Sequence, residues 1–181
     1  IYQTPFGTPP FDRIKTEHYE PAFDEGIRQL DEEVRAIAGN TEIPTFDNTV
    51  VALERSGKLL EKVSSAFFNV LNAEADDEMM EISQRVSPKL SESSNNIYLN
   101  EKLFTRIKSV YDRKEDLHLS TEDTRLLEKT FEAFSVRGAS LNPEDKEKYR
   151  KLSSELSLLS LTFDQNALKD KNRYELLLTE E

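Results

Sequence analysis

Two histidines, His18 and His118, are the first candidates for chemistry in this chain of 181 residues. They lie far apart in the sequence, and neither belongs to an H-E-x-x-H motif, so they form no local zinc pair. The chain has no cysteine, and it also lacks G-x-S-x-G and a glycine-rich phosphate loop. We therefore predict a capping or surface role for His18 at a helix start, a turn position for His118, and no catalytic, cofactor-binding or metal-ligating residue.

Carboxylates form a second group that could do chemistry by binding a hard cation. The cluster comprises Glu74, Asp76, Asp77, Glu78 and Glu81. It lacks the spacing and the central glycine of an EF-hand loop, whereas acids are favoured at the start of a helix by the helix dipole. We predict helix-start acids here, and a solvated helix face for the acidic residues 31–33.

Aromatic and small polar side chains could line a site for peptides. The candidate aromatic residues are Phe67, Phe68, Phe131 and Phe134. Their helical spacing favours a core position over a peptide groove. The polar run over residues 91–96 interrupts the apolar face of its helix, so it either faces a water-filled channel or forms a solvent-facing turn.

The elements that must position these residues are predicted to be helices. Only five glycines and seven prolines occur, and apolar residues recur every three or four positions. The predicted helices lie near 16–38, 47–74, 77–98, 100–112, 121–137 and 143–167. We expect an all-α fold of about six helices in antiparallel hairpins, with a helical domain over residues 16–168.

Several boundaries follow from individual residues. Residues 1–15 are predicted to form an extended arm, held over the helices by Phe6 and Phe11. Asp47 or Asn48 is expected to cap the second helix, with Phe46 packing on the first turn as a hydrophobic staple. Gly57 suggests close approach of a neighbouring backbone within that helix. Pro88 predicts a kink or break near residue 87.

The last predicted helix has the strongest start signal, Asn142-Pro143, followed by acids. Its apolar residues repeat at heptad spacing, so we expect it to run through the centre of the bundle, buried on more than one side. Residues 169–181 are predicted to be a linker and the start of a following region. Residues 174–178 resemble a strand, which needs partners, so we expect the polypeptide to continue beyond Glu181.

Charge and hydropathy limit the possible partners. The net charge of −11 repels phosphate backbones and anionic lipid headgroups, so we predict no nucleic-acid partner and no membrane association. No apolar run approaches the ~20 residues of a membrane span, and the first ten residues carry no targeting signal. We expect a soluble protein of the cytoplasm, with the periplasm as the alternative.

Several segments of the chain are informative when taken together. They are Pro5-Phe6, Pro10-Phe11, residues 18–22, residues 44–54, Ser56-Gly57, residues 88–90, residues 100–111, residues 138–141 and residues 152–166. In combination these segments resemble the N-terminal region of the thimet oligopeptidase family of zinc metallopeptidases. The similarity extends over nearly the whole chain, and within the family the sequence is most similar to bacterial peptidyl-dipeptidases.

This resemblance implies a large, mostly helical zinc peptidase whose two lobes flank a deep channel. The zinc and the H-E-x-x-H helix of such enzymes belong to a C-terminal domain, so the resemblance implies that this chain is a non-catalytic fragment, inactive alone, that restricts channel access. The implied partners are an oligopeptide substrate and the missing catalytic region in cis. The implied activity is release of C-terminal dipeptides, with an oligopeptidase A-type endopeptidase as the alternative.

A hypothesis of another class is a free-standing helical module that binds partners in an apolar groove. The coding sequence distinguishes the two. A stop codon after residue 181 favours the module, whereas a continuation that carries H-E-x-x-H favours the peptidase.

Overall fold

Helices form every regular element in the part of the chain that the computed structural model describes, which is residues 4–74 and 76–173. The all-α prediction is therefore confirmed for these residues. The elements are α1 (Tyr19–Gly39), α2 (Ala52–Glu54), α3 (Lys58–Glu74), α4 (Asp77–Tyr98), α5 (Glu101–Tyr111), α6 (Thr121–Val136) and α7 (Pro143–Arg173), with short turns at Pro5–Gly7, Thr16–His18, Phe46–Val51 and Lys114–Leu117. The predicted strand at 174–178 lies outside the described residues.

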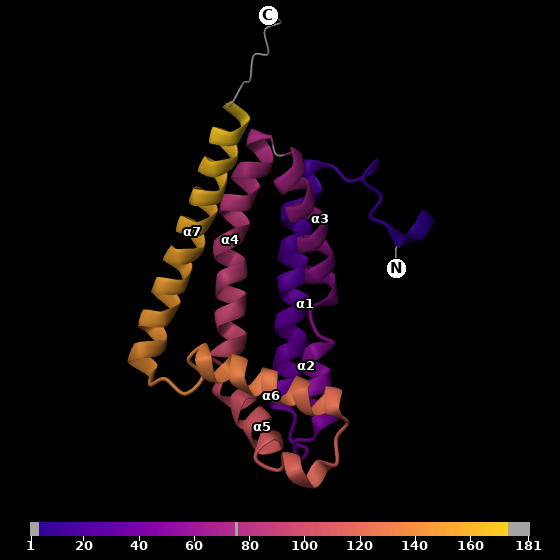
Figure 1. Ribbon diagram of the computed structural model, residues 1–181, viewed down its shortest axis with the longest axis vertical. Coiled ribbons are helices and arrows are strands. Elements are labelled where there is room, and N and C mark those ends of the chain that lie inside the picture. Colours follow the sequence, from indigo (N-terminus) through magenta and orange to yellow (C-terminus); the bar gives the residue numbers. More distant parts are fainter. Residues whose placement is uncertain (1–3, 75, 174–181) are drawn as a thin grey trace, which may run out of the picture.

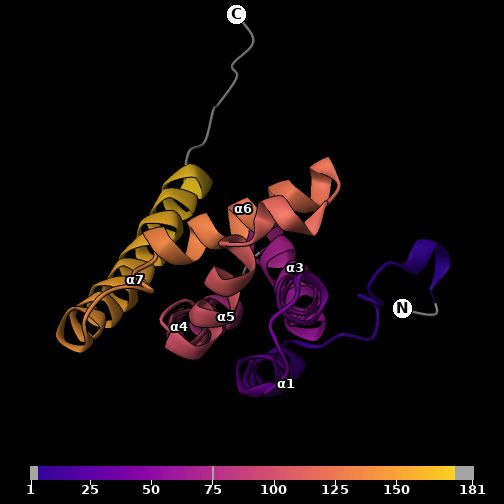
Figure 2. The ribbon, with the colours of Figure 1, turned by 90° about the horizontal axis from the view of Figure 1, so that it is seen from below.

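Four long helices run antiparallel along the molecule, as Figure 1 shows. α1 descends, α3 returns beside it, α4 descends again and α7 rises along the far side of α4. The shorter helices α5 and α6 pack across the lower end. Seen from below, α7 occupies the outer edge of the molecule (Figure 2).

The helix starts follow the caps that the sequence predicts, with one exception. Asp76, Asn100, Ser120 and Asn142 each accept a hydrogen bond from the backbone N–H three residues later, at 2.8–3.1 Å. The exception is the second predicted helix, where Thr45 is the cap and exchanges bonds with Asn48. The expected cap at Asp47 or Asn48 is thus wrong, because the chain closes its first turn two residues before Asp47.

The predicted continuous helix 47–74 is interrupted at residues 55–57. Gly57 adopts a left-handed backbone with φ of 72°, which ends the short α2 before α3 begins. Its N–H donates to Glu33 of α1 at 2.7 Å. The close helix–helix approach occurs instead at Gly26, where a β-carbon would lie 3.0 Å from the Leu60 backbone. Gly57 therefore allows a left-handed turn, and the predicted close approach of a neighbouring backbone at this residue is wrong.

Pro88 does not break its helix, because α4 continues from Asp77 to Tyr98 with Pro88 inside. The expected break near residue 87 is wrong. Packing of α4 against α1 on one side and α7 on the other holds the helix through the missing hydrogen bond.

Three apolar clusters form the core, and none includes α7. The first joins α1, α3 and α4 around Phe23 and Phe67. The second joins α1, α5 and α6 around Leu103 and Phe134, and the third lies below it around Val50. Phe46 and Val50 share this third cluster, so the predicted hydrophobic staple is confirmed.

The two ends of the described chain depart from expectation. Phe6 and Phe11 do not hold the N-terminal arm on the helices, because Phe6 is fully exposed and Phe11 is half exposed. Figure 1 shows the arm standing away from the bundle. At the other end α7 continues to Arg173, beyond the predicted end at 167, and it lies at the edge of the bundle rather than at its centre.

Candidate functional site

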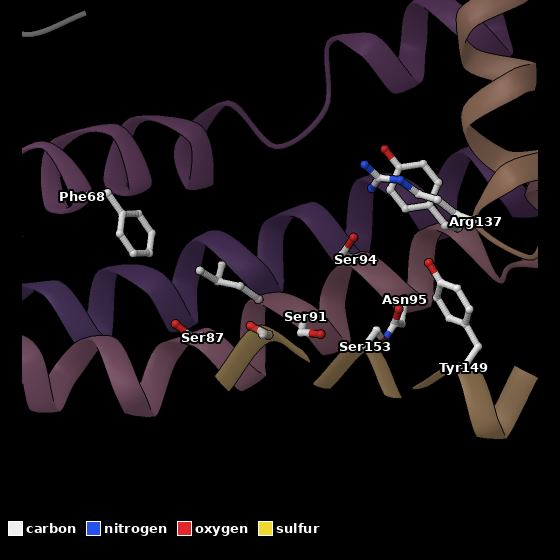
Figure 3. Close-up of a pocket in the computed structure, with 11 residues that line it drawn as sticks. Phe68, Ser87, Ser91, Ser94, Asn95, Arg137, Tyr149 and Ser153 are labelled. Atoms are coloured by element: carbon white, nitrogen blue, oxygen red, sulfur yellow. The ribbon is translucent and has the colours of Figure 1, made fainter. Parts of the chain in front are cut away.

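A cavity of about 400 Å³ lies in the seam between α4 and α7. It is the strongest candidate for a binding site that the described residues form. Many of the side chains that line it carry a hydroxyl group, as the close-up in Figure 3 shows. They are Ser87, Ser91, Ser94 and Tyr98 of α4 and Tyr149, Ser153 and Ser157 of α7.

Helical spacing places these hydroxyls on facing surfaces. Ser87, Ser91 and Ser94 recur at steps of four and three, so they form one stripe along α4. Ser153 and Ser157 are four residues apart on α7 and face that stripe. The polar run that the sequence left open between a channel and a solvent-facing turn therefore lines a cavity.

Asn95 closes one side of the cavity and joins its two walls. Its side-chain amide is nearly fully buried and donates a hydrogen bond to the Ser153 hydroxyl at 2.8 Å. Arg150 of α7 donates to Asn96 at 2.8 Å on the outer side. Farther along, Gln165 of α7 bonds to Ser83 of α4 at 3.1 Å. The seam is thus held by polar side chains.

An arginine on an aromatic ring forms the lower end of the cavity. The Arg137 guanidinium lies 4.2 Å from the ring centre of Tyr98, a cation–π contact. Phe68 of α3 forms the other end (Figure 3). The cavity therefore offers neutral hydroxyls along its length, one cation at one end and an aromatic face at the other.

The seam continues past Phe68 into a second cavity of about 620 Å³. Its walls are more apolar and include Leu71 of α3, Met80 of α4, and Leu161 and Leu168 of α7. Together the two cavities make an elongated space whose lower half is polar and whose upper half is apolar. Such a space suits an extended chain better than a compact ligand.

The charged groups of α4 are neutralised on its other side, against α1. Lys89 contacts Asp24 at 2.6 Å, which raises the lysine pKa chiefly through that hydrogen bond. Arg85 contacts Glu20 at 3.0 Å, and this hydrogen bond is the main cause of the lowered pKa of Glu20. The α4 side chains that line the first cavity are uncharged.

The chemistry of the first cavity is that of binding. Among its described lining residues none is aspartate, glutamate or histidine. A serine hydroxyl without an adjacent base is a weak nucleophile, so these hydroxyls are suited to donating and accepting hydrogen bonds. Backbone amides of a peptide are matching partners, because they present one donor and one acceptor per residue.

The predicted site residues do not come together. His18 accepts a hydrogen bond from the Lys15 backbone at a helix start, and His118 occupies a left-handed turn position, as predicted for each. In the acidic cluster, Asp76 caps α4 and Asp77 and Glu78 form its first turn. Across the described residues no group of three or more His, Cys, Asp or Glu side chains could hold a metal ion.

The candidate aromatic residues divide between core and cavity. Phe67 and Phe134 are buried, and Phe131 is partly buried against the second cluster, where it stacks on Tyr111, so the core prediction holds for these positions. Phe68 faces the cavity instead. The sequence did not indicate that Tyr149, Ser153 and Arg137 line this cavity. A detectable signal existed for Ser153, because it and Ser157 are four apart on the side of the helix away from its leucines.

The described part of the chain is an all-α region with a cavity between two of its helices. Its sequence is 43% identical to dipeptidyl carboxypeptidase of Escherichia coli strain K12 over 164 residues, which is 91% of this chain and 24% of that relative. It is 24% identical to oligopeptidase A of the same strain over 178 residues, and 25% identical to a thimet-like oligopeptidase of Dictyostelium discoideum over 166 residues. The resemblance to thimet-type peptidases is confirmed.

The chain spans about a quarter of the length of these relatives, since its matches cover 23–26% of each. No protein-family model matches it. In the described part of the chain, no helix is both long and apolar enough to span a bilayer.

Proposed function

We propose that this chain is the non-catalytic N-terminal helical domain of a zinc metallopeptidase that releases C-terminal dipeptides from short peptides. The observation that carries this proposal is the 43% identity to dipeptidyl carboxypeptidase across nine-tenths of the chain. The lower identity of 24% to oligopeptidase A makes the endopeptidase branch the alternative. We place the protein in the cytoplasm, with the periplasm as the alternative.

The zinc of such an enzyme does not fit the residues of this chain, because the described part offers no cluster of metal ligands. We propose that the zinc ligands belong to the rest of the polypeptide. The purified 181-residue chain should bind no stoichiometric zinc and should not cleave oligopeptides. Cleavage by this chain that a chelator abolishes would contradict the division of labour.

The seam between α4 and α7 supports a role in peptide access. Hydroxyl and amide groups can form hydrogen bonds with the backbone of any peptide, so they can bind substrates irrespective of the substrate side chains. We propose that this seam borders the peptide channel of the intact enzyme. A long peptide would then contact it, whereas a short peptide that occupies only the zinc site would not.

Filling the cavity tests this role in the full-length enzyme. Ser94→Trp places a large ring between α4 and α7, and we expect kcat/KM for long peptides to fall at least about tenfold, or ~1.4 kcal/mol, with short peptides unaffected. Glu81→Trp is the control, because it lies on the same helix with a 71% exposed side chain. Equal losses for long and short peptides would refute a role in access.

A free-standing interaction module remains the second candidate, and one specific observation favours it. Four large apolar side chains of α7 are exposed at Leu152, Leu156, Leu159 and Phe163. The coding sequence after residue 181 separates the candidates at little effort. A continuation with H-E-x-x-H supports the peptidase, and a stop codon supports the module.

A further inference from the structure

The largest group of exposed apolar side chains lies on α7. In the described part of the chain nine large apolar side chains are exposed, and five of them belong to this helix. Four follow one another at steps of four, three and four, and we call them the α7 stripe: Leu152, Leu156, Leu159 and Phe163, with exposed fractions of 66%, 64%, 60% and 73%. A helix at the surface of a self-sufficient domain normally turns such a stripe toward the core.

The α7 stripe faces away from the rest of the molecule. At about 100° per residue, its centre lies roughly 150° around the helix from the side chains that meet α4. That inner side carries hydrogen bonds from Asn95 to Ser153 and from Gln165 to Ser83, beside the partly buried Leu161 and Leu168. Rotating α7 to bury the stripe would break these bonds. The α7 stripe therefore stays turned away from the bundle.

A second α-helix is the element that fits this stripe. Alternating steps of four and three are the pattern by which two helices interlock side chains along a shallow crossing. Ser160, Thr162 and Glu155 flank the stripe, so a partner helix meets uncharged groups and one carboxylate there. The four side chains extend over about 16 Å of helix, which is three turns of contact.

The relatives contain enough polypeptide outside the matched stretch to supply that helix. The match to E. coli dipeptidyl carboxypeptidase covers 164 of 181 residues, so at most 17 residues lie outside it at either end and the stripe lies within it. The matched stretch is only 24% of that relative. A longer protein of this kind therefore has about three quarters of its length available to cover the stripe.

A second copy of this chain fits the stripe less well. Even at about 150 Å² for each of its four side chains, a generous value for a leucine, the stripe falls short of the ~800 Å² per partner that stable interfaces bury. Two copies would also bring together chains that each carry a net charge of −11. A partner within the same polypeptide needs a smaller contact, because the connection keeps its effective concentration high.

We propose that the α7 stripe is the surface on which this domain docks against a helix of the remaining polypeptide. This inference rests on the proposed function, in which the chain is one part of a longer peptidase. Docking on the outer side of α7 would hold α7 between the bundle on one side and the partner helix on the other. It would also fix the width of the seam, since α7 is one of its two walls.

Thiol labelling tests the proposal directly, because the chain has no cysteine of its own. Leu156→Cys is compared in the isolated 181-residue chain and in the full-length protein with any other cysteine replaced. We expect the maleimide reaction of this thiol to slow at least about tenfold in the full-length protein. Glu147→Cys is the matched control, because its side chain is 61% exposed on the opposite side of α7 and should react equally in both.

A charge substitution provides a second, independent measurement. Leu156→Lys should leave the melting temperature of the isolated chain within about 1 °C, because its side chain lies in water there. In the full-length protein the same change should lower the Tm by several degrees, since it buries an unpaired charge. A full-length variant that failed to fold, beside an isolated variant that folded normally, would support the same conclusion.

The outcomes separate this proposal from the proposed function. Equal labelling of Leu156→Cys in both proteins would overturn the docking surface even if the full-length protein is a zinc peptidase. Slow labelling in the isolated chain, together with a concentration-dependent dimer in sedimentation, would overturn it in favour of a second copy. Slow labelling only in the full-length protein supports docking, whether or not that protein cleaves peptides. Zinc-dependent hydrolysis is measured separately on the unmodified protein.

Discussion

The bundle of α1 and α3–α6 and the single helix α7 are stabilised in opposite ways. The bundle buries aromatic and aliphatic side chains in three clusters, and its charged groups pair at the surface. α7 meets the bundle through hydrogen bonds of its serine and glutamine side chains and through the partly buried Leu161 and Leu168, and it exposes the α7 stripe. Apolar burial is the dominant stabilising term in folding, so the bundle can stand alone while α7 depends on further contacts.

The largest effect should come from truncating the core and leaving α7 intact. Phe67→Ala removes a fully buried ring that contacts Tyr19, Phe23 and Phe68 edge-to-face, and should lower the free energy of unfolding by about 3–5 kcal/mol. Leu156→Ala on α7 should change it by less than about 0.5 kcal/mol in the isolated chain. Urea denaturation of both variants measures the difference. Similar losses would mean that α7 shares the core.

A buried arginine gives the next largest effect. Arg106 of α5 is nearly fully buried and donates to the backbone carbonyls of Asn40 and Glu42 at 2.6 and 3.0 Å, and to the side chain of Asn48 at 3.0 Å. Arg106→Ala would take this donor away from the two backbone carbonyls and should lower the stability of the bundle by about 2–3 kcal/mol.

Arg106→Lys sharpens this prediction, because an ammonium group cannot span the separate acceptors as the guanidinium fork does. It should recover part of the loss of Arg106→Ala in the same denaturation measurement. Full recovery by lysine would show that charge, rather than the fork geometry, holds the connection between α1 and α2.

Removing a hydrogen bond between α4 and α7 should have a smaller effect, confined to the local stability of α7. Asn95→Ala removes the buried bond to Ser153 and should lower the opening free energy of α7 by about 1 kcal/mol, without changing α1. Amide hydrogen exchange resolves the two helices. Asn96→Ala is the control, because its exposed bond to Arg150 can be replaced by water. Faster exchange throughout α1 would contradict an independent α7.

The smallest effect is a pH dependence within the bundle. The hydrogen bond from Arg85, and secondarily that from Lys89, lowers the pKa of Glu20 below its ordinary value of 4.5. The resulting stability is fully present above pH 4.5 and is lost as the pH falls through the lowered pKa. Exposed pairs of this kind contribute less than about 1 kcal/mol.

Glu20→Gln should therefore lower the Tm near pH 7 and have a smaller effect at acid pH, as the carboxylate takes up a proton at its lowered pKa. Thermal melts across this range measure the difference. An equal effect of the substitution at both pH values would show that the ion pair does not link α1 to α4.

Local signals predicted most of the helices because they act within one turn of the chain. The caps at Asp76, Asn100, Ser120 and Asn142 are hydrogen bonds between near neighbours, and all of them form. The interruption at Gly57 was missed because a single glycine serves equally as a close contact or as a left-handed turn. The candidate cavity was anticipated only in part, through the polar run over residues 91–96.

The sequence by itself determined the all-α fold, most of the helix starts, the absence of cysteine chemistry and the resemblance to thimet-type peptidases. Each depends on residue types or on spacings within a helix. Only the tertiary structure decided which face of α7 meets α4. Heptad leucines predict a buried stripe, but periodicity records that a face is apolar and not what lies against it. The leucines point outward because serine, asparagine and glutamine already satisfy the inner face by hydrogen bonds.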